Sequence, residues 1–233
     1  MNVHNLVIEI TARCNMRCAH CMRGDARHED ISGDVIDAVA RNINYASNLT
    51  ITGGEPGLRP RIMQNLLSAF QARGVAVGDF YIVTNAKRVT REFECAVDAW
   101  LRYCEDNEVS GVAVSSDHYH DASSAAGVCR LEDICESHGV EFDRKNNANY
   151  VKAIGRGEYV CNTGTPSRLG LGYHIEDYDS YFEVETLVVD RHGRMLSDCD
   201  YSFDETDEPG NSAGSILDDD PLGLLLKWNE SHP

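Results

Sequence analysis

Three cysteines lie close enough together in the sequence to bind one metal centre. Cys14, Cys18 and Cys21 fall within eight residues, whereas the other six of the nine cysteines are scattered. Thiolates are soft ligands that suit Zn²⁺ or an iron–sulfur cluster. Because a structural zinc site is normally closed by four ligands, three thiolates in one loop predict a metal centre with an open position or a fourth ligand from elsewhere.

A second chemical motif is the glycine-rich segment GGEPG at residues 53–57. Gly53 and Gly54 allow close approach of another backbone or of a ligand, and Glu55 can accept charge-assisted hydrogen bonds. Taken alone, the segment could equally be a plain turn with a solvated carboxylate. Its place directly after an apolar run favours a binding role.

The elements that must position these motifs alternate between β-type runs and amphipathic stretches. Helices are expected from Asp30 or Ser32 to about 46, from Pro60, at 90–105 and at 123–138. Strands are expected at 4–10, 49–52, 80–85, 109–117 and 140–143. Strands separated by such helices form parallel βαβ units, which place ligand sites at the C-terminal strand ends. The units are too few for a closed eight-stranded barrel, so we expect an α/β fold, an open or partial (β/α)6 barrel.

The character of the sequence changes after about residue 158. Residues 181–200 resemble two antiparallel strands joined through a turn at His192-Gly193. Nine carboxylates and no basic residue lie between Asp198 and Asp220, and a short apolar helix is expected at 222–228. We therefore expect two units, a core at 1–157 and a small hairpin-containing extension at 158–233.

Composition excludes several classes of protein. The 233 residues include 21 basic and 38 acidic side chains, and the net charge of −17 disfavours binding along a nucleic-acid duplex, although a single flipped base is not excluded. No apolar run reaches the roughly 18 residues of a membrane span, and no signal peptide is evident. We expect a cytoplasmic protein without a membrane partner.

Together, the two motifs resemble those of the radical S-adenosylmethionine (SAM) enzyme family. The C-x3-C-x2-C loop follows the first expected strand and the GGE segment follows the second, and the resemblance covers residues 3 to about 143. It implies that Cys14, Cys18 and Cys21 bind a [4Fe–4S] cluster whose open iron binds SAM. The cluster then reductively cleaves SAM to a 5′-deoxyadenosyl radical that abstracts hydrogen from a substrate.

The same resemblance implies a set of SAM-binding residues around the cluster. Glu55 is expected to accept a hydrogen bond from the SAM ammonium, and His20 to present its backbone to the adenine. Ser115 and Asp117 are expected near the ribose. The complete implied set is His20, Gly53, Gly54, Glu55, Asn85, Ser115 and Asp117.

The C-terminal part resembles a SPASM or Twitch extension, on residues 153–157 and on the run from Val189 to Cys199. Cys161 and Cys199 are too few for a second four-thiolate cluster, so we expect a degenerate extension without one. Cys161 is then a buried residue or a thiol that donates hydrogen to a product radical. His118 is the other candidate catalytic residue, because it could hydrogen-bond a substrate or move a proton near neutral pH.

The leading functional hypothesis is hydrogen abstraction from a peptide, amino-acid or similar small substrate. The alternative is an isomerase or modification enzyme that acts on a nucleoside or a modified base. The non-catalytic alternatives are an iron–sulfur redox protein and a zinc protein. A flavodoxin or ferredoxin is expected to deliver the electron, docked on a rim of positive charge formed by Arg13, Arg17, Arg23 and Arg27.

Overall fold

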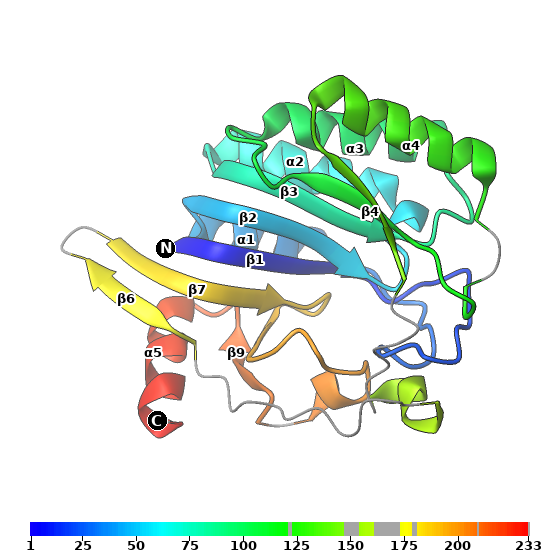
Figure 1. Cartoon of the computed structure of the whole chain (residues 1–233). Coiled ribbons are helices and arrows are strands. Elements are labelled where there is room, and N and C mark those ends of the chain that lie inside the picture. The colour runs from blue at the N-terminus through cyan, green and yellow to red at the C-terminus, as the bar shows by residue number, and fades with distance from the viewer. Residues whose placement is uncertain (121–122, 147–153, 161–172, 179–180, 209, 233) are drawn as a thin grey trace.

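The computed structural model describes residues 1–120, 123–146, 154–160, 173–178, 181–208 and 210–232 (Figure 1). The strands are β1 (Asn2–Thr11), β2 (Tyr45–Gly53), β3 (Ala76–Thr84), β4 (Gly111–Ser115), β5 (Glu141–Lys145), β6 (Ile175–Tyr178), β7 (Tyr181–Val189), β8 (Arg194–Leu196) and β9 (Ser212–Ser215). The α-helices are α1 (Gly33–Asn42), α2 (Pro60–Arg73), α3 (Arg91–Tyr103), α4 (Ala125–His138) and α5 (Pro221–Ser231). Three short 3-10 helices are η1 (Pro56–Leu58), η2 (Gly155–Tyr159) and η3 (Glu205–Asp207).

One continuous sheet joins all of these strands, in the order β5-β4-β3-β2-β1-β7-β8-β9, with β6 paired to β7. Strands β1 to β5 are parallel to one another, and β7 is parallel to β1. Helices α1 to α4 pack side by side along the sheet (Figure 1). The sheet does not close within the described residues. The predicted α/β fold with a partial barrel is thus confirmed.

Local sequence explains where the elements begin and end. The Ser32 side chain accepts a hydrogen bond from the Val35 backbone and caps α1, so Ser32 rather than Asp30 is the N-cap. The helix expected to reach about residue 46 ends at Asn42, because β2 starts at Tyr45, where it pairs with β1. In the core, Trp100 of α3 lies between Phe70 of α2 and the ring of Phe80 on β3.

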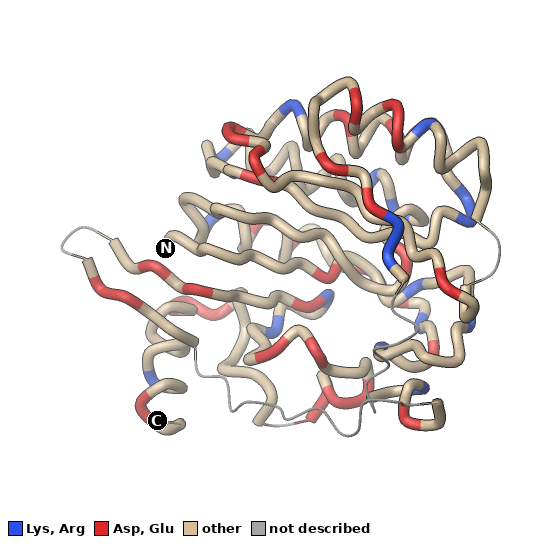
Figure 2. The backbone as a smooth tube through the Cα atoms, in the orientation of Figure 1, with Lys and Arg blue, Asp and Glu red and all other residues tan. Residues whose placement is uncertain are grey.

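The C-terminal part extends the same sheet. Strands β7 and β8 form the predicted hairpin through a turn at His192-Gly193, and the predicted C-terminal helix is α5. Acidic residues recur along this part of the chain (Figure 2). They are partly neutralised, since Asp207 lies 2.8 Å from both Arg27 and Arg194. In the described part of the chain, no helix is both long enough and apolar enough to cross a membrane.

Candidate active site

A cavity of about 510 Å³ opens at the edge where the parallel strands end, next to the loop that carries the three cysteines (Figure 1). Loops after β1, β2, β3 and β4 all contribute to it, as expected for parallel strands. It brings together most of the residues singled out in the sequence. Those that line it are Cys14, Cys18, His20, Cys21, Gly53, Gly54, Glu55, Asn85 and Ser115.

The three cysteine side chains fit a cluster better than a single zinc ion. A tetrahedral zinc ion with Zn–S bonds of about 2.3 Å would hold its sulfur ligands roughly 3.8 Å apart. The Sγ atoms of Cys14, Cys18 and Cys21, all within the described residues, do not converge to within 4.8 Å of one another. A cluster with one iron for each thiolate needs this wider spacing. The donor set therefore fits an iron–sulfur cluster.

The protonation of the thiols depends on burial and on one another. Burial, with the negative charges of Cys21 and Cys14, raises the pKa of Cys18 to about 11. Burial also raises the pKa of Cys14. These two side chains are thus thiols at neutral pH, and a bound metal must displace their protons.

Glu55 links the GGE segment to the end of β3. Its Oε1 accepts hydrogen bonds from the Thr84 hydroxyl (2.6 Å) and the Gly57 N–H (2.9 Å), and its Oε2 accepts one from the Asn85 N–H (2.7 Å). Burial raises the pKa of Glu55, while the Asn85, Thr84 and Gly57 donors oppose this rise. Because a carboxylate has about four acceptor sites, room for one further donor remains on Oε2.

Gly53 and Gly54 are required by the cysteine loop itself. A Cβ atom on Gly53, whose φ is +142°, would lie 2.2 Å from the Thr11 carbonyl oxygen, and one on Gly54 would lie 2.4 Å from the Arg13 carbonyl oxygen. The Gly54 and Glu55 N–H groups donate to these same oxygens, each at 2.8 Å. The glycines thus allow the GGE segment to hold the start of the cysteine loop.

Asn85, at the end of β3, contacts the cysteine loop directly. Its side-chain amide donates to Asn15 Oδ1 at 2.9 Å and lies 3.9 Å from Cys14 Sγ. Hydrogen bonds to cluster sulfurs are one of the means by which a protein sets the reduction potential. Asn85 therefore lies where it can contact the metal centre as well as a cosubstrate.

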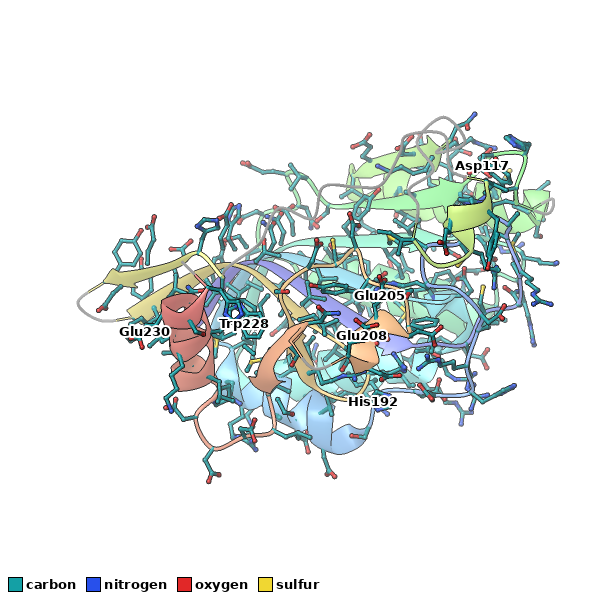
Figure 3. All side chains as sticks on the ribbon, turned by 90° about the horizontal axis from the view of Figure 1, so that it is seen from below. Asp117, His192, Glu205, Glu208, Trp228 and Glu230 are labelled. Atoms are coloured by element: carbon teal, nitrogen blue, oxygen red, sulfur yellow. The ribbon has the colours of Figure 1, made fainter. Side chains whose placement is uncertain are left out.

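Beyond β4, Asp117 orients His120 rather than lining the cavity itself. Asp117 Oδ1 lies 2.7 Å from His120 Nδ1, and Oδ2 lies 3.9 Å from His20 Nε2. Burial alone would raise the pKa of Asp117, but the His120 side chain and the Tyr119 N–H outweigh it and hold the pKa below its usual value. Burial lowers the pKa of His20. Figure 3 places Asp117 at the opposite end of the molecule from Trp228 and Glu230 of α5.

Two expected catalytic residues are not placed in the cavity. His118 does not line it and instead packs against Tyr119, with ring centroids 4.0 Å apart. His120 takes that position, and its spacing from Asp117 was the available signal, because a turn joins His120 N–H to the Asp117 carbonyl. Cys161 lies outside the described residues.

Two further lining residues were not expected there. Arg23 was assigned to an exposed rim, but it is 8% exposed and donates to the Tyr201 carbonyl at 2.7 Å. Asp200 enters the lining from the C-terminal part. No sequence signal indicates this position, since it depends on contacts between residues more than 170 positions apart.

Asp30 fixes the base of the cysteine loop. Its carboxylate accepts hydrogen bonds from the Thr11 hydroxyl (2.6 Å) and from the Nε groups of Arg13 and Arg59 (3.0 Å each). Burial raises the pKa of Asp30, but these three donors outweigh it and hold the pKa below its usual value. The pair of arginines thus binds a carboxylate that is ionised at neutral pH.

We expect Asp30→Asn to lower the free energy of unfolding by about 1–3 kcal/mol at pH 7. Because the folded-state pKa is depressed, this contribution is present above the unfolded pKa of about 3.9 and is lost as the pH falls through the folded value. Urea unfolding of both proteins between pH 7 and pH 3 measures it. The exposed Asp37→Asn is the control. A difference that is constant across this range would contradict the prediction.

Comparisons with known proteins agree with this geometry. The family model of the radical SAM superfamily matches residues 8–167. GTP 3′,8-cyclase of Desulforamulus reducens is 32% identical over 91 residues, 36% of this chain and 27% of that protein. GTP 3′,8-cyclase of Chlorobaculum tepidum is 30% identical over 98 residues, 40% of this chain and 29% of that protein. The match thus spans less than a third of the length of these curated relatives.

Solved structures share the fold. The enzyme anSMEcpe with bound AdoMet superimposes with a TM-score of 0.60 at 14% identity, covering 99% of this chain and 82% of that one. The same protein with bound AdoMet and Cp18Cys peptide gives a TM-score of 0.57, also at 14% identity, and covers 100% and 82%. At this identity the likeness concerns the fold alone.

Proposed function

Because the chain belongs to the radical SAM superfamily, whose enzymes use a [4Fe–4S] cluster and SAM, we propose that it abstracts hydrogen from a substrate bound in the cavity beside the cysteine loop. The single observation that supports this most is the meeting of three thiols and a buried glutamate in one cavity. We also propose that residues 1–157 form the catalytic core and that residues 158–233 are a SPASM- or Twitch-like extension that completes the site.

The proposed roles follow from the contacts of each residue. Cys14, Cys18 and Cys21 would hold three irons. The bound cluster supplies the electron that cleaves SAM reductively to methionine and a 5′-deoxyadenosyl radical. Glu55 Oε2 would accept a hydrogen bond from the SAM ammonium, whose positive charge would favour the ionised carboxylate against burial.

The other lining residues would bind SAM or move protons. Asn85 would hold the Cys14 side of the centre, and Ser115 would contact the sugar. Asp117 would act through His120, since it holds the Nδ1 side of that imidazole and so fixes which nitrogen can exchange a proton with substrate. His20, packed 5.0 Å from the His120 ring, would present its backbone to the adenine.

For the substrate, we favour a peptide, amino acid or similar small molecule. The fold likeness to anSMEcpe, solved with a peptide, is consistent with this class. The net charge of −17 also disfavours a long nucleic acid. Asp200 and Arg23 in the lining would meet the charged groups of such a substrate.

The second candidate is a nucleoside or a modified base. The curated relatives with the listed similarity are GTP 3′,8-cyclases, and this observation supports the nucleotide class for part of the core. Consumption of GTP in the presence of SAM and reductant, followed by chromatography, separates the two candidates. Turnover of GTP would favour the nucleotide class, whereas its recovery unchanged would favour the peptide class.

We further propose a flavodoxin or ferredoxin as the electron donor. Of the arginines first assigned to the docking rim, Arg17 has a side chain that is 78% exposed, whereas Arg27 is held by Asp204 and Asp207. A cavity of about 370 Å³ on the Cys14 side of the loop adds Arg59 and Arg88. An acidic partner would be steered to this side of the cysteine loop.

The proposal is tested with the anaerobically reconstituted full chain. We expect absorbance near 400 nm, about four irons per chain and dithionite-dependent release of 5′-deoxyadenosine from SAM. A chain that binds zinc with higher affinity than iron, or a loaded chain that leaves SAM intact, would contradict it. About eight irons would instead show that the extension binds a second cluster.

A further inference from the structure

The loop that carries the three cysteines has little structure of its own. Residues 12–29 contain neither helix nor strand. Between the cysteines and Gly24, the loop makes two internal backbone hydrogen bonds, from Cys21 N to Cys18 O and from Gly24 N to Cys21 O, both 3.2 Å long. Such a segment cannot hold three side chains in fixed positions alone, so its conformation depends on contacts from other parts of the chain.

One residue from beyond the fifth strand makes several of these contacts. The Arg156 N–H donates to the Cys21 carbonyl at 3.0 Å, and Arg156 Nε donates to the Cys18 carbonyl at 3.0 Å. Its Nη1 donates to Asp25 Oδ1 at 2.6 Å. The side chain of Arg156 is 18% exposed. A single residue thus joins three points of the loop, two of them at proposed cluster ligands.

The residue before Arg156 is shaped for the same contact. Gly155 has a φ of +56°, and a Cβ atom there would lie 2.3 Å from the Met22 carbonyl oxygen and 2.8 Å from that of Cys21. These are backbone atoms that cannot move aside without displacing the loop. Only glycine allows the chain to pass this close while Arg156 reaches the two carbonyls.

We propose that Arg156 is a positioning residue that fixes the cysteine loop in its ligand-binding conformation. Its planar guanidinium and its backbone N–H hold the carbonyls of Cys18 and Cys21 at a set separation, which orients the two thiols toward the cavity. Its positive charge also lies beside the thiolates that a cluster would require. The role assigned to the cluster rests on the proposed function, whereas the contact with the loop does not.

Three variants test the role. Arg156→Gln removes the charge and the donor fork, and Arg156→Lys keeps the charge but loses the planar geometry. Arg102→Gln is the matched control, because it also breaks an Arg–Asp ion pair (2.9 Å, to Asp98) but lies on α3 with a side chain that is 70% exposed. The measurements are hydrogen exchange at the Cys21 and Gly24 amides of the metal-free chain, iron content after reconstitution, and the midpoint potential of the loaded protein.

For Arg156→Gln we expect at least about tenfold faster exchange at both amides and a cluster affinity about 10–100-fold lower, as for other outer contacts of metal ligands. The midpoint potential of any retained cluster should fall, because a nearby positive charge is lost. Arg156→Lys should be intermediate in exchange and iron content, and should retain more of the potential. Arg102→Gln should match the wild type in all three measurements.

Wild-type exchange and iron content in Arg156→Gln would overturn the inference. If circular dichroism shows that this variant is unfolded, Arg156→Lys decides, and a lysine variant identical to wild type would overturn it as well. If the wild type itself binds no iron, the proposed function fails, while the exchange measurement on the metal-free chain still decides whether Arg156 positions the loop.

Discussion

Replacing Cys18 with alanine is expected to abolish both iron binding and the cleavage of SAM. The variant leaves two of the three thiols in the cavity, and the affinity lost with a direct ligand should exceed the roughly 10–100-fold typical of outer contacts. The Cys18 thiol has its pKa raised to about 11, so the free side chain is uncharged and its removal should cost the metal-free fold little. Iron analysis and 5′-deoxyadenosine release after anaerobic reconstitution measure the effect.

The chain supplies its own control for this experiment. Cys95 of α3 and Cys129 of α4 are exposed and lie outside the cavity lining. Their alanine variants should retain wild-type iron content, with stability changes within about 0.5 kcal/mol. Equal iron in the Cys18→Ala and wild-type proteins would show that the loop is not the metal site.

Gly54→Ala is expected to displace the cysteine loop and destabilise the fold together. The added Cβ would lie 2.4 Å from the Arg13 carbonyl oxygen and 2.8 Å from its carbon, both of them backbone atoms. Accommodating it requires separation of β2 from the loop, with loss of the hydrogen bonds from Gly54 N–H and Glu55 N–H. We expect a loss of about 2–3 kcal/mol and a melting temperature lower by about 5–10 °C.

The second expected effect of Gly54→Ala is on metal binding. Arg13 immediately precedes Cys14, so a shift of its carbonyl should move the first thiol and lower the iron content. Gly33→Ala is the control, since a Cβ at Gly33 meets no atom within 4 Å. A Gly54→Ala protein with wild-type melting temperature and iron content would mean that the two segments are not in this close contact.

The close packing at Gly54 also changes the interpretation of the GGE motif. From the sequence, the two glycines could serve either a ligand or another backbone. The structure shows that they are required by the loop backbone at Thr11 and Arg13 before any ligand is considered. Glu55 in the same way is already bonded to Gly57, Thr84 and Asn85, so its role in holding β2 to β3 accompanies its proposed role in binding SAM.

The sequence by itself determined the parallel α/β core and the clustering of the cysteines and the GGE segment at one edge of the sheet. Both follow from local causes, since apolar periodicity sets each strand and helix and parallel strands end at a common edge. The sequence could also indicate a hairpin near His192, because turn residues act over short distances.

Only the tertiary structure decided which residues from the C-terminal part complete the site. It placed β7 beside β1, buried Arg23 against Tyr201, exchanged His118 for His120 in the lining and brought Arg156 onto the Cys18 carbonyl. The Arg156 contact joins residues 138 positions apart. Neither periodicity nor motif spacing carries information on such a contact, because it arises from the packing of whole elements.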